Sequence, residues 1–264
     1  MTPYLELSYL DLALAALLLV FNAALSLALG LRLEGRMLVA AARMVVQLLL
    51  VGLVLRALFE QASPWLTGSV ALLMVLFAGR EILARQERRL TGWWGHGIGS
   101  ATMLLSGMVV TVLALNGPLR PDPWHDPRYA IPLFGMILGN AMTGISLGLD
   151  SLTSLARRDR AGIEAQLLLG ASRWRALRPI AQRSLRTGFT PMLNSMAAAG
   201  VVFLPGMMTG QILAGVAPEQ AVKYQILVLF LIAGATGLGV LSAVVASVWR
   251  LTDSRHRLRL DRLE

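Results

Sequence analysis

The sequence contains no cysteine, a single lysine and three histidines in 264 residues. The lack of cysteine excludes disulfides and thiolate metal sites. The one lysine, Lys223, does not belong to a GxxxxGK[ST] pattern, so the chain has no P-loop with which to bind ATP phosphates. Charged residues make up 15% of the chain, whereas soluble domains carry about a quarter. These absences exclude a P-loop ATPase and argue against a soluble fold.

Groups that could perform catalysis are also scarce. His96, His125 and His256 each occur without a partner at metal-ligand spacing, so no metal site is assigned to them. Asp122 and Asp126 lie in a proline-rich loop, where solvated carboxylates are common. No Ser/His/Asp or paired-carboxylate arrangement has a useful spacing. We therefore predict that the chain is not an enzyme and binds no cofactor itself.

Apolar residues dominate what is present. They account for 56% of the chain, and several runs approach the roughly 20 residues that span a bilayer core. Such continuous apolar runs must be helical, because barrel strands would alternate polar and apolar residues. We predict an all-α polytopic membrane protein, a single domain over residues 1–264, whose charged tail after Arg250 is solvated. The seven expected spans cover residues 8–30, 37–58, 65–84, 98–116, 129–155, 187–204 and 221–249.

The distribution of basic residues predicts the orientation. With the N-terminus outside, most arginines fall in the links and the C-terminal tail that face the cytosol, as the positive-inside rule requires. The basic residues left outside are Arg56, Arg120, Arg128 and Lys223. The net charge of +9 is then explained by membrane topology, with no need for nucleic acid. We expect a multi-pass protein of a bacterial inner membrane with a cytosolic C-terminus.

A polar segment, residues 157–186, interrupts the apolar runs between the fifth and sixth spans. Its apolar side chains recur at helical spacing, which predicts an amphipathic helix at the membrane surface or against a partner. They are Ile163, Leu167, Ala171, Trp174 and Leu177. The predicted orientation places this segment in the cytosol.

The centre of the segment, EAQLLLGA from Glu164 to Ala171, resembles the EAA loop of ABC-transporter permeases. That loop has Glu-Ala, then a glycine six positions after the glutamate. The resemblance implies a short cytosolic coupling helix seated on a separate ATPase subunit, which would bind ATP and Mg²⁺. The alternative is an interfacial helix that only lies on the membrane. The candidate coupling residues are Glu164, Ala165, Leu168, Gly170, Ala171 and Trp174.

The flanking sequence resembles the FetB-type iron-export permease family (UPF0014-like), which includes plant aluminium-tolerance permeases. The matching pieces are ARMVVQLLLVG (42–52), GMILGNAMTGISLGLDSL (135–152), IEAQLLLGASRWRA (163–176), PMLNSMAAAGVVFLPGMMTGQILAG (191–215) and AVKYQI (221–226). The chain departs slightly from the family pattern at Phe203. The resemblance implies metal export, an ATPase partner and a permease homodimer.

Polar and thioether side chains within the spans are candidates for a substrate path, because polar groups inside a membrane are costly. They are Arg43 and Gln47 in the second span, Asn140 and Thr143 in the fifth, Asn194 in the sixth, and Met207, Met208 and Gln211 after it. Amide oxygens suit hard cations and thioethers suit soft ones.

Each candidate has a simpler interpretation. Arg43 could extend its charge to the interface or pair with Asp150. The asparagines could join helices by hydrogen bonds, and the methionines could simply pack. Two other functions stay open: a stand-alone secondary carrier using Arg43 and Asp150 as a charge relay, and an ABC permease for a non-metal substrate such as a nucleotide sugar.

Overall fold

The computed structural model describes residues 8–61, 63–253 and 255–263, and regular structure in these ranges is helical. The chain divides into two compact units, 1–61 and 62–264, and each is described by itself. The elements are α1 (Tyr9–Ala28), α2 (Glu34–Gln61), α3 (Pro64–Ala84), α4 (Trp93–Ala114), a π-helical turn η1 (Leu115–Leu119), α5 (Pro127–Arg158), α6 (Arg160–Leu168), α7 (Arg173–Ala198), α8 (Gly206–Leu213), α9 (Pro218–Arg250) and a 3-10 turn η2 (Leu260–Arg262).

Six helices in the described ranges are long and apolar enough to cross a membrane: α1, α2, α3, α4 with η1, α5 and α9. They correspond to six of the expected spans, with ends that differ by a few residues. The expected sixth span, 187–204, is not among them. Its residues begin within α7, whose first half is rich in arginine, and the helix ends at Ala198. Helical structure resumes only at Gly206.

The first unit contains α1 and α2, which pack against each other. A capping box starts α1: Asp11 N–H donates to Ser8 Oγ at 3.3 Å, and the Asp11 carboxylate accepts the Ser8 N–H at 2.8 Å. The turn between the helices is held by Ser26, whose Oγ accepts from Leu33 N and donates to Glu34 Oε2 at 2.9 Å. Local polar contacts thus define both ends of α1.

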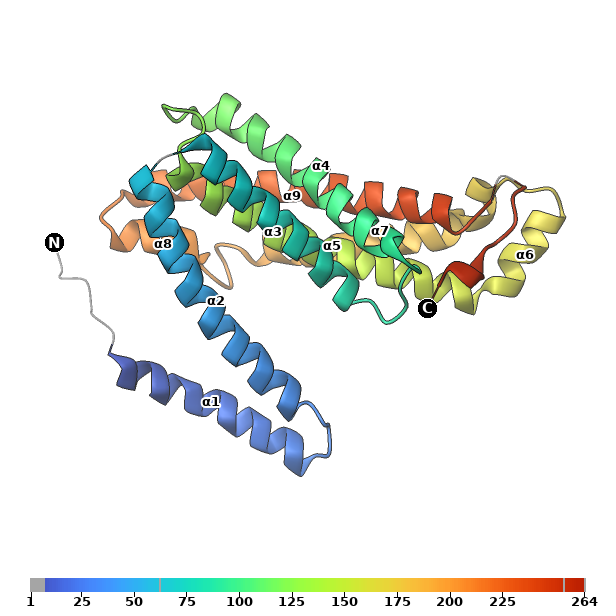
Figure 1. Ribbon diagram of the computed structural model, residues 1–264, viewed down its shortest axis with the longest axis horizontal. Coiled ribbons are helices and arrows are strands. Elements are labelled where there is room, and N and C mark those ends of the chain that lie inside the picture. Colours follow the sequence, from blue (N-terminus) through green and yellow to red (C-terminus); the bar gives the residue numbers. More distant parts are fainter. Residues whose placement is uncertain (1–7, 62, 254, 264) are drawn as a thin grey trace. The chain divides into compact units, whose positions relative to one another are not determined.

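The second unit is built around α5, which contacts α3, α4, α7 and α9 (Figure 1). Small residues bring the backbones close. A Cβ built on Gly144 would lie 2.7 Å from the Gly188 carbonyl oxygen of α7, and one on Gly188 would lie 2.6 Å from Val240 Cγ1 of α9. Gly144 and Gly148 thus permit close helix approach. Gly139, in contrast, faces open space.

The α3–α4 link meets the C-terminal part of α5 at one end of this unit. Asp150 Oδ1 of α5 accepts the Glu87 N–H at 2.8 Å, and Thr153 Oγ1 donates to the Arg88 carbonyl at 3.2 Å. The segment α6 lies at this same end, while α8 lies at the opposite end (Figure 1). The fold therefore gathers at one end two links that the sequence predicts to be cytosolic.

Residues 251–253 and 255–263 of the C-terminal segment also lie at this end, and the expectation that the tail is solvated holds for charged residues such as Arg255 and Arg257 but not for its leucines. Leu251 is fully buried and Leu263 nearly so. Thr91 N–H donates to the Arg262 carbonyl at 2.8 Å, and Arg262 Nη1 donates to the Arg250 carbonyl. Leucines of the charged tail thus pack into the core of the unit, while most of its charged side chains stay at the surface.

Candidate functional site

The polar segment 157–186 is a helix–turn–helix, which corrects the prediction of one amphipathic helix. The central helix α5 continues to Arg158, α6 follows after Asp159, and α7 begins at Arg173 and runs on into the apolar part of the chain. Ser172 starts α7 by accepting the Arg175 N–H at 3.4 Å. α7 is continuous from Arg173 past Arg186, so the turn is joined without a break to the helix that packs along α5.

The turn between α6 and α7 depends on Gly170. Its φ is +84°, in the left-handed region that favours glycine. Gly170 N–H donates to the Leu167 carbonyl at 3.1 Å, and Ala171 N–H donates to the Gln166 carbonyl at 3.0 Å. These two bonds form a Schellman motif, which satisfies the last carbonyls of α6. The glycine predicted from the EAA-like pattern therefore ends the short helix.

Two leucines at this turn are almost entirely exposed. Leu168 and Leu169 each retain 88% of their accessible surface, although the segment around them is polar. Ile163 of α6 and Leu177 of α7 are instead buried, at 3% and 0% exposure, and fasten the two helices to the rest of the unit. We name the turn from Leu168 to Gly170 the apolar tip. It is a protruding apolar feature on a firmly anchored base.

The other predicted coupling residues surround this tip. Glu164 forms an ion pair with Arg160 at 2.8 Å on the outer surface of α6, and Ala165 is exposed beside it. Ala171 is half-buried, and Trp174 keeps 42% of its surface exposed. All six predicted coupling residues therefore lie on α6, the turn or the first turn of α7.

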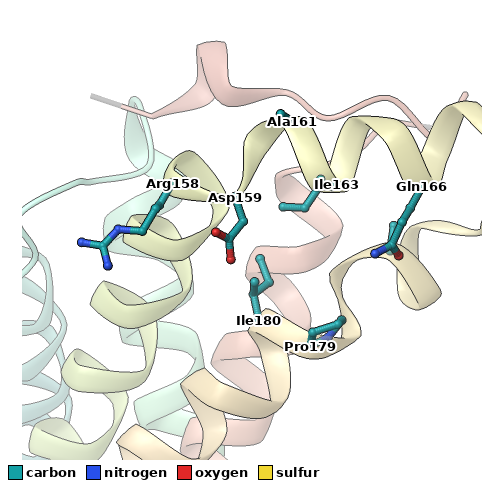
Figure 2. A pocket seen from close by; sticks show the side chains of 9 residues that line it. Arg158, Asp159, Ala161, Ile163, Gln166, Pro179 and Ile180 are labelled. Atoms are coloured by element: carbon teal, nitrogen blue, oxygen red, sulfur yellow. The ribbon is translucent and has the colours of Figure 1, made fainter.

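A hollow of about 390 Å³ separates α6 from α7 behind the tip. In Figure 2, Asp159, Ile163 and Gln166 approach it from one side, and Pro179 and Ile180 from the other, while Arg158 points away. Its walls combine a carboxylate, an amide and apolar groups.

The start of α7 is tied to the C-terminal segment. His256 Nδ1 accepts the Arg173 N–H at 3.3 Å, and the Arg173 guanidinium lies 4.9 Å from the centre of the Trp249 ring. Asp253 stabilises the C-terminal segment, because its carboxylate accepts the backbone N–H groups of Arg255 and Arg257, each at 2.9 Å. The Arg257 backbone N–H lowers the pKa of Asp253 most strongly. A hydrogen bond from Arg259 lowers the pKa of Asp261 to about 2.

The predicted path residues belong to both units and are described unit by unit. Arg43 and Gln47 are exposed on α2 in the first unit. Asn140 and Thr143 lie on the outward face of α5, where they donate to the Met136 and Gly139 carbonyls of their own helix, at 2.8 and 3.2 Å. Asn194 is exposed on α7. Asp150 of α5 accepts the backbone N–H of Glu87, and its pairing with Arg43 stays a prediction.

The residues after α7 are divided between the core and a cavity. Met207 packs against the apolar cluster between α4, α5 and α9, which agrees with its interpretation as a packing residue. Met208 lines a cavity of about 530 Å³ between the end of α7, α8 and α9. Gln211 is half-buried, and its Oε1 has no hydrogen-bond partner among the residues that the structure describes.

Two groups of functional interest were missed by sequence reasoning. Leu169 was not among the predicted coupling residues, yet it is as exposed as its neighbour Leu168, which was. Gln225 and Met196 line the cavity with Met208. Gln225 could have been noticed as an amide within the last apolar run. Within the described ranges, no group of three or more His, Asp or Glu residues could hold a metal ion.

Comparison with known proteins assigns the chain to a family. The model of UPF0014, described as an uncharacterised protein family, matches residues 9–251. The chain belongs to the UPF0014 family. It is 36% identical to a UPF0014 membrane protein of Synechocystis, over 86% of this chain and 87% of the relative. No solved structure matches it.

Two other UPF0014 relatives have more informative names. The probable iron export permease protein FetB of Escherichia coli K12 is 33% identical over 96% of each chain. The protein ALUMINUM SENSITIVE 3 of Arabidopsis thaliana is 33% identical over 84% of this chain and 79% of the relative. With its apolar helices, this family membership makes the chain an integral membrane protein of a permease family.

Proposed function

We propose that this protein is the permease subunit of an ABC transporter and that a separate ATPase, holding ATP and Mg²⁺, binds its apolar tip. The observation that carries the proposal is the 88% exposure of both Leu168 and Leu169 in a polar segment. Leaving two leucines in water forgoes about 1.5–3 kcal/mol each relative to burial. Adjacent exposed apolar side chains on a rigid support are typical of a surface that a partner covers.

The base of the tip suits mechanical coupling. Its two helices are fastened by buried Ile163 and Leu177, and α7 continues from the turn towards the cavity at the other end of the unit. Movement of the tip would therefore be carried along α7, past its contact with α5 at Gly188. The absence of a P-loop from the chain agrees with an ATPase on another subunit.

The orientation follows from the charges. The α3–α4 link, α6, the start of α7 and the C-terminal segment share one end of the second unit, and all except α6, which has only Arg160, contain three or more arginines. The positive-inside rule makes that end cytosolic, where an ATPase would bind. We propose α7 as the remaining crossing, which gives seven spans with the N-terminus outside, in a bacterial inner membrane. Transport would involve a permease homodimer.

The proposed cargo is iron or another metal, exported from the cytosol. This rests on the FetB relative, named a probable iron export permease, and on the similarity to the Arabidopsis protein. The carrier alternative would use Arg43 and Asp150 as a charge relay, and the Glu87 N–H occupies only one oxygen of the Asp150 carboxylate. The ABC permease is the better supported function because the FetB relative is named a permease and because Leu168 and Leu169 are exposed together.

Co-purification tests the tip. The full-length chain would be co-expressed with the ATPase encoded nearest to it, and the complex isolated through a tag on the permease. We expect Leu168→Glu and Leu169→Glu to remove most of the bound ATPase, because each change places a charge in an apolar contact. Gln182→Glu adds the same charge on exposed α7 and should leave binding intact. Full retention of the ATPase by both leucine variants would refute the proposal.

A further inference from the structure

The cavity beside Met208 has a composition that points to its ligand. It lies between the end of α7, α8 and the first turns of α9, remote from the apolar tip, since α8 and α6 lie at opposite ends of the second unit (Figure 1). Its volume is about 530 Å³, within the range of cavities that hold small organic molecules. A single desolvated metal ion would occupy only a small part of that space.

The walls carry no charged side chain. They are made by Met196, Ala199, Gly200, Leu204, Pro205, Met208, Val222, Gln225, Ile226, Leu229 and Phe230. A bare divalent ion would have to leave its water shell for thioethers and one amide, which are poor replacements for oxygen ligands of a hard cation. Burying an unpaired charge among apolar groups is also strongly unfavourable. The lining therefore disfavours a free hard ion.

Gln225 is the one side chain in this lining that can make strong hydrogen bonds. It is 8% exposed, and within the described ranges its buried Oε1 has no hydrogen-bond partner. A buried amide left unpaired costs about 1–3 kcal/mol, so native structures normally supply a partner. Rotation about the last side-chain bond can present either the oxygen or the NH₂ group to the cavity. Gln225 is thus placed to bind a polar group on an otherwise apolar ligand.

We propose that this cavity binds a neutral, largely apolar organic molecule that forms a hydrogen bond with the side-chain amide of Gln225. Apolar contact with Phe230, Leu229 and the thioether of Met208 supplies most of the affinity, and Gln225 selects for the polar group. That the bound molecule is the transported cargo rests on the proposed function. In that case a metal passes this cavity inside a neutral organic complex and not as a bare ion.

The lack of cysteine provides a specific assay on the full-length permease in lipid nanodiscs, without the ATPase. Val222→Cys places a unique thiol in the cavity wall, and Lys223→Cys places one on the adjacent exposed position as a control. The rate of maleimide labelling is measured at increasing concentrations of 2-naphthol or of naphthalene. The two molecules have similar shapes and differ by one hydroxyl group. We expect both probes to slow labelling only in the Val222→Cys protein, with 2-naphthol about fivefold more potent, as one neutral hydrogen bond predicts.

Gln225→Met keeps the length of the side chain and removes the amide. In this variant of the Val222→Cys protein, 2-naphthol should lose its about fivefold advantage while naphthalene protection is unchanged. If this variant does not fold, comparing the two probes in the Val222→Cys protein that retains Gln225 still tests the proposal. Equal potency of the probes there would overturn the proposal and identify an apolar hollow that lipid or a second copy covers.

Stronger protection of the Val222→Cys thiol by Fe²⁺ salts than by 2-naphthol, without protection of the Lys223→Cys control, would also overturn the proposal in favour of a metal-ion site. The assay is independent of the ATPase. If the leucine variants of the tip retain all of the ATPase, the proposed function fails but the labelling result for the cavity is unaffected. If the labelling experiment fails, the test of ATPase binding at the tip is likewise unaffected.

Discussion

At the scale of single residues, backbone geometry and unpaired polar groups carry the most information. Gly170 combines φ of +84° with open space around its missing Cβ. A side chain there meets no steric obstacle, yet the left-handed conformation costs a non-glycine residue roughly 1–2 kcal/mol. The glycine is therefore required by the turn that presents the tip and not by contact with a neighbour.

Gly170→Ala should loosen the tip and reduce ATP hydrolysis by the assembled complex several-fold, with little effect on the insertion of the chain. Gly162→Ala is the matched control, because Gly162 lies in α6 at ordinary φ with open space around it and alanine favours helix. Stimulated ATPase activity in the reconstituted complex measures both. Undiminished activity in the Gly170 variant would show that the turn is not needed for coupling.

Asn140 presents an amide on the outward face of α5, bonded to its own helix at Met136. We expect Asn140→Leu to lower metal efflux without lowering the thermal unfolding midpoint, because the bond that is lost joins no second helix. Leu241→Ala, also at an exposed position, is the control and should retain efflux. Efflux at the normal rate in the Asn140 variant would remove this residue from the proposed path.

At the scale of elements, the packing of α5, α7 and α9 depends on backbone approach that larger residues prevent. A Cβ on Gly188 would meet the Gly144 carbonyl at 2.8 Å and Val240 Cγ1 at 2.6 Å. The first contact is with backbone, which cannot move aside as a flexible side chain could. This contact also lies on the helix that is expected to carry movement from the tip.

Gly188→Ala should therefore destabilise the unit by about 1–3 kcal/mol, the usual cost of overpacking, and lower its thermal unfolding midpoint in detergent. Gly139→Ala serves as its control, because Gly139 faces open space and should leave the midpoint nearly unchanged. Equal midpoints for the two variants would contradict the close contact of α5 and α7.

At the scale of the whole molecule, the C-terminal segment joins elements that are distant in the sequence. It contacts the α3–α4 link through Thr91 and the start of α7 through His256. Asp253 organises the segment by accepting the Arg255 and Arg257 N–H groups. The tail is thus part of the base that supports the tip.

Asp253→Asn should loosen this segment and speed tryptic cleavage after Arg255 and Arg257 at pH 8, whereas Glu219→Gln, in the first turn of α9, should not. Because the folded pKa of Asp253 lies below its ordinary value of 3.8, its contribution is present above about pH 4 and is lost as the pH falls through the folded value. After correction for intrinsic rates, amide hydrogen exchange of residues 251–253 and 255–263 should therefore be slow at pH 5 and faster at about pH 2. Equal corrected exchange at these two pH values would contradict this.

Much of the architecture could be predicted because its causes are local. Membrane insertion, helicity and charge asymmetry depend on composition and periodicity within windows of about 20 residues. The glycine that ends the short helix could also be identified, since the pattern around Glu164 places Gly170 at a helix end. The sequence by itself therefore determined the class of protein, the placement of six spans and the position of the polar segment 157–186.

Other features depend on partners distant in the chain, and only the tertiary structure decided them. The segment 157–186 splits into two helices because Ile163 and Leu177 are buried and Gly170 allows the turn between them. The charged tail is docked because its leucines meet a core that its own sequence does not contain. Gln225 becomes a binding group only where the ends of α7 and α8 enclose it. Burial and hydrogen-bond satisfaction are properties of the assembled fold, and local patterns do not encode them.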